Sequence, residues 1–157
     1  MKNVKMDYSE NADRIPGFLL WQVSKLWQRH LNAALADLKL SSTQAVILGN
    51  IVRMTGQKKT VTQIALSEQT KVDPMTTSQA IRTLEKKKLI KRVVSKEDKR
   101  AFSIIPTRQG VQVALQALQK LAKAHDEFFK PFEQDLVSFG NQLQRLLESN
   151  SSPEDEV

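Results

Sequence analysis

Residues 62–107 constrain this chain more than any other stretch, because they place two short helix signals and a hairpin signal in a row. The first helix signal follows a candidate N-cap, Thr62, and ends at Lys71. The second begins at Asp73 and Pro74, where Asp is a favoured N-cap and Pro suits the first helical position. Two helices a few residues apart, the second opening with small hydroxylated side chains, are typical of a helix-turn-helix.

A hairpin is expected directly after the second helix. Residues 90–95 and 101–105 are short and rich in branched side chains, and the residues between them, KEDKR, are charged. This pattern predicts two antiparallel strands joined by a charged tip. A hairpin in this position is a wing, a second probe that can touch DNA beside the groove that holds the helix.

Several spaced motifs of the chain resemble the MarR family of bacterial transcription regulators. They are Asp98-x-Arg100 with Thr107-x-x-Gly110 after an apolar strand, Leu84-Glu85, Leu89-Ile90-x-Arg92, and Leu40-Ser41-x-x-Gln44. The resemblance covers roughly residues 14–148, in the family's order and spacing. Together with the residue patterns it predicts a mainly α fold with a small β wing, a winged helix-turn-helix domain plus N- and C-terminal dimerisation helices. One position departs: Lys88 stands where the family usually has Gly, so it must take a positive φ or the helix must end differently.

Helix signals also lie on both sides of this stretch. Residues 14–38 carry apolar side chains at steps of three and four, which predicts one long amphipathic helix. Ser41 and Gln44 form a capping-box pattern that begins a second helix. Thr107 is a candidate N-cap for a long helix that reaches Pro131, and the last helix has an apolar seam suited to packing against another helix.

We therefore expect the chain to divide into segments with different roles. They are a flexible N-terminus at residues 1–13, a winged helix-turn-helix DNA-binding domain at 40–106, a helical dimerisation region at 14–39 and 107–148, and a disordered acidic tail at 149–157. The terminal helices are too long and too apolar to be covered by so small a central domain, and such a surface normally marks a partner interface.

A second copy of the chain is the expected partner, because most soluble oligomers are two-fold dimers. The alternative is that the terminal helices fold back into one intramolecular bundle. A homodimer would present two recognition helices to neighbouring major grooves of a palindromic operator in double-stranded DNA, about 34 Å apart.

Basic charge is concentrated in the stretch that carries the helix-turn-helix and wing. The chain has a formal net charge of +7. Residues 58–100 hold twelve Lys/Arg and five Asp/Glu, whereas residues 125–157 hold two Lys/Arg and eight Asp/Glu. A positive surface is what binding to phosphates requires. The alternative is that the lysines at 86–88 form only a solvated face.

The second helix supplies candidate DNA contacts. If Ile81 and Leu84 face the core, polar side chains project from its other faces. Gln79 can pair with adenine, and Arg82 can bind guanine or a phosphate. In the resembling family the matching positions enter the major groove. We expect contacts from Thr76, Ser78, Gln79 and Arg82, whereas Met75 and Thr77 are expected to pack inside.

The predicted wing supplies the other contacts. The resemblance implies that Arg100 enters the minor groove and that Asp98 orients it, and a guanidinium suits the negative potential of a narrow groove. Lys96 and Lys99 are expected to contact phosphates, and Arg53 and Arg92 are weaker candidates. The alternative for Asp98 and Arg100 is a surface ion pair without consequence.

No enzyme activity, cofactor or metal is expected. The chain has no cysteine, which removes disulfides, zinc–thiolate sites and thiol redox sensing. His30 and His125 have no carboxylate at metal-site spacing and are expected to be surface or interface residues, and neither Gly-x-Ser-x-Gly nor a phosphate-binding Gly-rich loop occurs. The polar N-terminus lacks a secretion signal, and no apolar run approaches the roughly 18 residues of a membrane helix, so a cytoplasmic protein is expected.

Two functions remain. The first is a homodimeric, sequence-specific DNA-binding transcription regulator, with repression favoured over activation. The resemblance implies that a small aromatic or phenolic ligand between the dimerisation helices and the winged helix releases the DNA, and such a cleft would be lined by Trp21, Trp27, His30, Met54 and Arg53 unless these are simply core. The second is a winged-helix protein–protein adaptor without its own operator.

Overall fold

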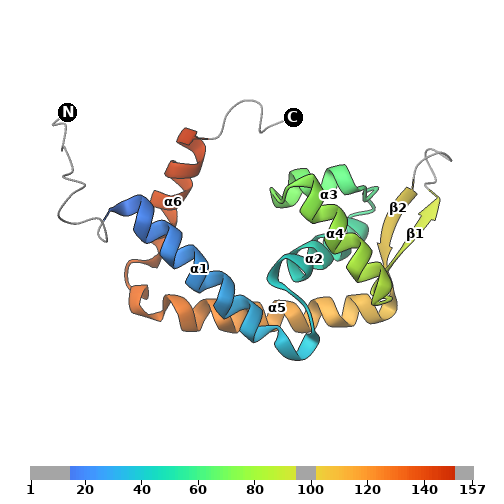
Figure 1. Cartoon of the computed structure of the whole chain (residues 1–157), viewed down its shortest axis with the longest axis horizontal. Coiled ribbons are helices and arrows are strands. Elements are labelled where there is room, and N and C mark those ends of the chain that lie inside the picture. Colours follow the sequence, from blue (N-terminus) through green and yellow to red (C-terminus); the bar gives the residue numbers. More distant parts are fainter. Residues whose placement is uncertain (1–14, 95–101, 151–157) are drawn as a thin grey trace.

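The computed structural model describes residues 15–94 and 102–150 (Figure 1). Its elements are α1 (Pro16–Ala34), the short 3-10 helix η2 (Ala36–Leu38), α2 (Ser42–Gly56), α3 (Gln63–Thr70), α4 (Pro74–Lys86), β1 (Ile90–Val94), β2 (Phe102–Pro106), α5 (Arg108–Phe129), the 3-10 helix η3 (Lys130–Phe132) and α6 (Leu136–Asn150). β1 and β2 pair antiparallel, with Ile90 opposite Pro106 and Val94 opposite Phe102. The protein is mainly α with a small β wing, as the sequence predicts.

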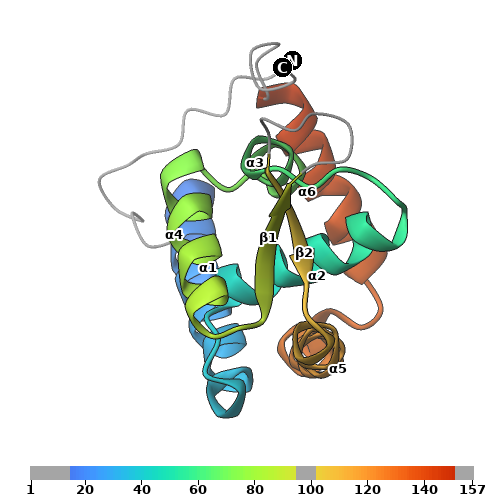
Figure 2. The same cartoon turned by 90° about the vertical axis from the view of Figure 1, so that its right-hand side faces the viewer.

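Helix α5 runs along the molecule and joins two groups of elements (Figure 1). α1 and α6 lie toward one end of it, and α2, α3, α4 and the two strands lie toward the other. Figure 2 looks along α5 and shows β1 and β2 side by side, with α4 next to β1. The helix-turn-helix and the wing are thus held apart from the terminal helices.

One hydrophobic core fills the helix-turn-helix end of the molecule. Its largest fully buried apolar side chains are Leu35, Ile47, Leu48, Ile51, Val61, Leu66, Ile81 and Leu84. α5 joins this core through small residues, Ala114 and Ala117, which allow the helix axis to approach closely. Burying an apolar side chain of this size contributes roughly 1.5–3 kcal/mol, so this core accounts for the position of α4.

The predicted helix starts are confirmed. Ser41 Oγ accepts a hydrogen bond from the Gln44 N–H at 3.2 Å, and Gln44 Oε1 accepts one from the Ser41 N–H at 3.4 Å. Asp73 Oδ1 accepts one from the Thr76 N–H at 2.8 Å, and Thr62 caps α3 in the same way. Each bond satisfies an N–H group that a helix leaves unpaired, so these starts follow from sequence-local chemistry.

Four helices end in the same way, with a lysine of positive φ after them, and the sequence indicates this only at Lys88. Each is followed by a lysine in the left-handed region: Lys39, Lys58, Lys71 and Lys88, with φ between 54° and 58°. At the last of these the Lys88 N–H bonds Glu85 O at 2.9 Å and the Leu89 N–H bonds Leu84 O at 3.0 Å, which satisfies carbonyls at the end of α4. Lys88 therefore takes the positive φ that its departure from the family pattern allowed.

The Thr107-x-x-Gly110 motif joins the wing to α5. Thr107 Oγ1 accepts from the Gly110 N–H at 3.0 Å and donates to Lys88 O at 2.8 Å, while the Thr107 N–H donates to Leu89 O at 2.9 Å. A Cβ added at Gly110 would lie 1.9 Å from Leu89 O. Only glycine permits this close approach of α5 to the chain that enters β1.

Some element boundaries differ from the sequence predictions. α1 ends at Ala34 rather than near residue 38, because the chain turns through η2 there. The long helix expected to reach Pro131 ends at Phe129, and the chain passes through η3 before the last helix begins at Leu136. α6 continues to Asn150, so the first two residues of the predicted acidic tail are helical. The rest of that tail and the predicted flexible N-terminus, residues 1–13, lie outside the described residues.

Within the described residues the sheet has two strands, and the segment before α3 is not one of them. Val61 nevertheless lies along β2, because the Ile104 N–H donates to Val61 O at 2.8 Å and the Val61 N–H donates to Ser103 Oγ at 3.3 Å. This segment ties the start of α3 to the base of the wing.

The terminal helices expose most of their apolar side chains. α1 and α6 contain no buried residue. The exposed large apolar side chains on them are Phe18, Leu19, Leu20, Trp21, Val23, Leu26, Val137, Leu146 and Leu147. α5 also exposes Leu115 and Leu118. Within one chain these helices therefore do not close into the intramolecular bundle that was the alternative to a partner interface.

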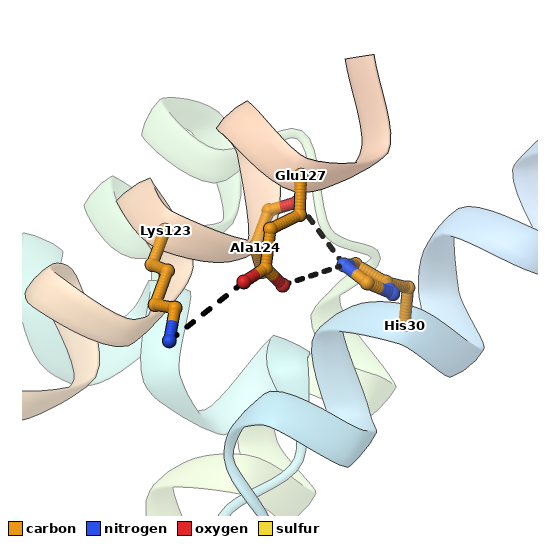
Figure 3. Close-up of polar contacts among 4 residues, drawn as sticks. All are labelled: His30, Lys123, Ala124 and Glu127. Atoms are coloured by element: carbon orange, nitrogen blue, oxygen red, sulfur yellow. Dashed lines mark hydrogen bonds and ion pairs between the residues drawn. The ribbon is translucent and has the colours of Figure 1, made fainter. Parts of the chain in front are cut away.

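α1 is fastened to α5 through His30 (Figure 3). His30 Nε2 lies 3.1 Å from Ala124 O and 4.0 Å from Glu127 Oε2, and Lys123 Nζ lies 3.7 Å from Glu127 Oε1. Because a carbonyl oxygen only accepts, Nε2 carries the hydrogen in this contact. The ring of Trp27 packs beside this contact, with ring centroids 5.0 to 6.4 Å from those of His30, His125, Phe128 and Phe129.

Candidate nucleic-acid interface

Helix α4 has a buried face and an exposed face at helical spacing. Its buried side chains are Thr77, Ala80, Ile81 and Leu84. Its exposed face is centred on Met75, Gln79, Arg82 and Lys86, which recur at steps of four, three and four residues. The core thus holds one side of the helix and leaves the opposite side open to a partner.

The turn between α3 and α4 is fixed by polar side chains of both helices. Ser67 Oγ and Thr77 Oγ1 donate to Val72 O at 2.6 and 3.2 Å, which also explains why a threonine is fully buried here. Gln63 Nε2 donates to Pro74 O at 3.3 Å. These three bonds fix α4 relative to α3, so the exposed face of α4 is presented in one orientation.

Asp73 places a negative charge at the start of α4. Hydrogen bonds from the Thr76 side chain and the Thr76 N–H lower the pKa of the Asp73 carboxyl below its ordinary value. The carboxylate is therefore ionised at neutral pH and lies at the positive end of the helix dipole, where it stabilises the first turn. Thr76 is thus engaged in capping through both its N–H and its side chain while it remains exposed.

The four contacts predicted on this helix lie on or beside its open face. Thr76, Gln79 and Arg82 are exposed, and Ser78 is half-buried at the edge. The prediction that Thr77 packs inside is confirmed, since its side chain is fully buried. That these residues touch DNA stays a prediction.

The expectation that Met75 packs inside is wrong, because its side chain is 81% exposed. The signal that could have found this was helical spacing. Ile81 and Leu84 fix the buried direction, and a residue six positions before Ile81 points away from it. The position of Met75 on the helix, rather than its apolar side chain, decides its exposure.

The lysines that end α4 have different environments. Lys87 Nζ turns back and donates to Lys39 O and, at 3.3 Å, to Gln44 Oε1, so it holds α4 to the start of α2. Lys86 and Lys88 are exposed. Only these two of the run therefore form the open basic face, and Lys87 is a structural contact.

The two weaker basic candidates are engaged within the chain. Arg92 Nε lies 3.3 Å from Glu85 Oε2, and both side chains are about half exposed. Arg53 Nη2 donates to Asn50 Oδ1 at 3.0 Å. Each would have to exchange this bond for a phosphate, which weakens its case as a DNA contact.

The wing contacts predicted at Lys96, Asp98, Lys99 and Arg100 lie outside the described residues. The strands that lead to them are described, and they end in the pair Val94 and Phe102, whose side chains are 55% and 60% exposed. β1 follows directly after α4, so the base of the wing lies next to α4, at the same end of the molecule as the exposed face of that helix (Figure 2).

The side chains considered for a ligand cleft have different surroundings. Trp27 and His30 are in ring contact with each other at the junction of α1 and α5. Met54 belongs to the core, whereas Trp21 is exposed and stacks on Phe18. Of the five candidates, Trp27 and His30 are the pair that the structure shows together.

Across residues 15–94 and 102–150, none of the helices has the length and apolar character needed to cross a membrane.

Residues 37–101 match the model of the MarR family. Over 114 residues the chain is 38% identical to an uncharacterized HTH-type transcriptional regulator, YdcH, of Bacillus subtilis strain 168, and the match covers 73% of this chain and 78% of that protein. An identity of 38% over this share of both chains is high enough to place them in the same family.

Solved structures are similar to the whole molecule. A mutant MarR from E. coli complexed with operator DNA has a TM-score of 0.76 at 24% identity, over 87% of this chain and 96% of that one. The S. aureus MepR–DNA complex has a TM-score of 0.76 at 20% identity, over 88% and 99%. CouR from Rhodococcus jostii RHA1 bound to p-coumaroyl-CoA has a TM-score of 0.75 at 24% identity, over 92% and 97%.

These likenesses confirm the winged helix-turn-helix fold that the sequence predicts. The family match spans the motifs from Leu40 to Arg100. The structure shows the capping role of Ser41 with Gln44 and the close packing at Gly110. The family consists of transcription regulators rather than enzymes. The chain therefore belongs to the MarR family of winged helix-turn-helix, DNA-binding transcription regulators.

Proposed function

We propose that this regulator is a homodimeric repressor that binds a palindromic operator and responds to a small-molecule ligand. The observation that carries the DNA-binding part is the exposed face of α4, which presents Gln79, Arg82 and Lys86 on a helix whose other face is locked in the core. The segment that carries this face, residues 58–100, has twelve basic residues against five acidic ones, a charge that favours binding to phosphates.

In this proposal residues 40–106 are the DNA-binding unit. Recognition helices place the residues of their N-terminal half against base edges in the major groove, so Thr76, Ser78, Gln79 and Arg82 are the proposed contacts there. Lys96, Asp98, Lys99 and Arg100 are the proposed wing contacts with the minor groove and its phosphates. The similar structures of a MarR mutant and of MepR with DNA support this use of the fold.

Residues 14–39 and 107–148 are the proposed dimerisation region. α1 and α6 bury no residue within the chain and expose a series of large apolar side chains, a surface that a second copy would cover. Repression is proposed because a dimer bound across an operator can block an overlapping promoter with no further surface than DNA binding and dimerisation require.

The proposed ligand is a small aromatic or phenolic molecule near the junction of α1 and α5. Trp27 and His30 offer an aromatic face and a ring nitrogen there. CouR, which has the same fold, is bound to p-coumaroyl-CoA, and this supports an aromatic acyl compound as a ligand class. Such a ligand acts only if it binds the free conformation and the DNA-bound conformation with different affinity.

Selection of bound duplexes from a random pool tests the DNA-binding proposal. We expect a palindromic site with half-site centres about one helical turn, 10 base pairs, or a multiple of it apart. Light scattering on the same protein should give the mass of a dimer. The proposal would be contradicted if the selected duplexes shared no common sequence, or if the protein bound the selected site as a monomer.

Variants assign the individual contacts. Arg100→Ala is expected to weaken operator binding at least tenfold and leave the dimer intact, whereas Lys130→Ala, exposed in η3, serves as a matched loss of charge. Replacing a lysine that contacts a phosphate should lower the slope of log K against log salt by about one unit. Gln79→Ala should change the selected sequence, and a uniform loss on all sequences would make Gln79 a backbone contact.

A panel of small phenolic and aromatic carboxylates tests the ligand proposal. We expect at least one of them to release the operator, and Trp27→Ala to weaken this response in a protein that still binds DNA. Operator binding that none of the panel changes would contradict an aromatic ligand and leave the DNA-binding proposal standing.

A further inference from the structure

Met75 is an apolar side chain in the middle of a polar surface. It is 81% exposed, the highest value among the exposed large hydrophobic side chains of the described residues. Its neighbours on the open face of α4 are Gln79, Arg82 and Lys86, all polar and exposed. Met75 buries little within the chain, and it stands on the helix face proposed to meet DNA, so a contact with DNA is available to it.

The backbone that carries Met75 is well fixed. Met75 occupies the second position of α4, directly after Pro74 and two residues after the N-cap Asp73. Pro74 O accepts a hydrogen bond from Gln63 Nε2, and Asp73 Oδ1 accepts one from the Thr76 N–H. The side chain is therefore presented from an ordered first turn rather than from a frayed helix end.

The C5-methyl group of thymine is the apolar group that the major-groove code presents, beside the hydrogen-bond donors and acceptors of the other base edges. We propose that Met75 is a specificity-determining residue that packs against a thymine methyl group in each half-site. The inference rests on the proposed function, in which the N-terminal half of α4 lies in the major groove.

Helix geometry places that thymine. Met75 and Gln79 are four residues apart on the same face, which is about 6 Å along the helix axis. Successive base pairs are about 3.4 Å apart. The thymine therefore lies within about two base pairs of the base that Gln79 contacts, and an adenine is the base that Gln79 suits.

Replacing thymine by deoxyuridine removes only the methyl group, so it tests the contact directly. In the operator obtained by selection, each thymine pair related by the two-fold axis is replaced in turn, and wild-type affinity is measured. One position is expected to weaken binding about fourfold for each half-site, the factor for one buried methyl group. Met75→Ala is expected to bind the thymine and deoxyuridine operators equally.

Ile64→Ala is the matched control. Ile64 is also apolar, 71% exposed and at the second position of its helix, α3, which precedes the recognition helix. This variant should keep the fourfold preference for thymine. Far-UV circular dichroism checks that both variants are folded, which their exposure leads us to expect.

Three results separate this inference from the function on which it rests. Tight wild-type binding that tolerates deoxyuridine at every position overturns the role of Met75 and leaves operator binding intact. A Met75→Ala protein that still prefers thymine at the same position also overturns it. A wild-type protein that selects no operator overturns the proposed function itself, and the role of Met75 with it.

Discussion

The two ends of α5 differ in how completely one chain covers its own apolar side chains. At the helix-turn-helix end, Leu48, Ile51 and Leu84 are fully buried, whereas α1 and α6 at the other end bury no residue. The helix-turn-helix end, here called the finished end, has a core that one chain closes by itself and that can hold α4 rigidly. The other end also carries large apolar side chains, but one chain leaves them exposed, and the proposed second copy would bury them.

α5 contributes to both ends. Ala114 and Ala117 pack against the core of the helix-turn-helix end, whereas Leu115 and Leu118 stay exposed. His30 of α1 contacts Ala124 O, which belongs to α5. One continuous helix, α5, therefore connects α1 to the helix-turn-helix end.

The largest expected effect comes from placing a charge in the uncovered end. Leu146→Glu introduces a carboxylate at a side chain that is 55% exposed in one chain and lies on the apolar face of α6. If a second copy covers that face, the unpaired charge should weaken the dimer by about 3 kcal/mol or more, over 100-fold in dissociation constant. Sedimentation equilibrium measures this.

Asn141→Glu, exposed on the opposite side of α6, is the matched control for that variant and should leave the dimer unchanged. Circular dichroism should show both variants with a folded helix-turn-helix end, because its core is separate. If Leu146→Glu and wild type dissociate alike, the contrast between the two ends does not arise from dimerisation.

Gly110→Ala tests the finished end. Its Cβ would lie 1.9 Å from Leu89 O, which is backbone and cannot turn aside, so α5 must move from the wing. We expect a loss of about 3 kcal/mol in the free energy of unfolding, at the upper end of overpacking effects. Gly140→Ala in α6, where a Cβ meets nothing within 4 Å, should instead stabilise by about 0.5–1 kcal/mol. Equal urea midpoints for the two variants would remove the close approach as a constraint.

Lys88→Gly probes a smaller strain in the same end. Lys88 has a φ of 58°, a conformation that costs a side-chain-bearing residue about 1 kcal/mol and glycine almost nothing. The variant should gain about 0.5–1 kcal/mol in the free energy of unfolding. Lys86→Gly removes the same charge at the last residue of α4, where the lower helix propensity of Gly should cost up to about 1 kcal/mol, so changes of opposite sign are expected in urea titrations. A loss in both would show that Lys88 is held by contacts of its side chain.

Elements defined by neighbours in sequence could be predicted, and contacts across the fold could not. Asp73 with Pro74, and Ser41 with Gln44, mark helix starts through bonds that span three residues, so the pattern and the structure agree. Lys87 looked like one more basic residue of a run, but its partner Lys39 O is 48 positions away. No local pattern reports such a contact.

Exposure at the candidate interface was predictable where helical spacing was given priority over residue type. Thr77 and Met75 lie two positions apart and point to opposite sides of α4. The polar Thr77 is buried and the apolar Met75 is exposed. Thr77 can be buried because its hydroxyl group donates a hydrogen bond to Val72 O. The end of α1 depended on η2 and on the buried Leu35, whose packing arises only when the helices meet. The sequence shows apolar content there but not its partner.

The smallest expected effect is a pH dependence that distinguishes the cap of α4 from the rest of the finished end. The pKa of Asp73 is lowered from its ordinary value of 3.8 by hydrogen bonds from Thr76. A carboxyl with a depressed pKa stabilises the fold above its unfolded pKa, and the contribution is lost as the pH falls through the folded pKa. Asp73→Asn keeps a good N-cap that does not titrate.

Wild type should therefore be more stable than Asp73→Asn at pH 6, and the difference should shrink as the pH falls below about 3.8, the ordinary value. Urea unfolding at steps between pH 6 and pH 3 measures this. Asp37, whose pKa is lowered by its hydrogen bond with Lys120 of α5, keeps part of the acid dependence in both proteins, so each curve still slopes. A difference that stays constant across this range would mean that the carboxylate charge of Asp73 adds nothing to the cap, and that only its geometry orders the first turn from which Met75 projects.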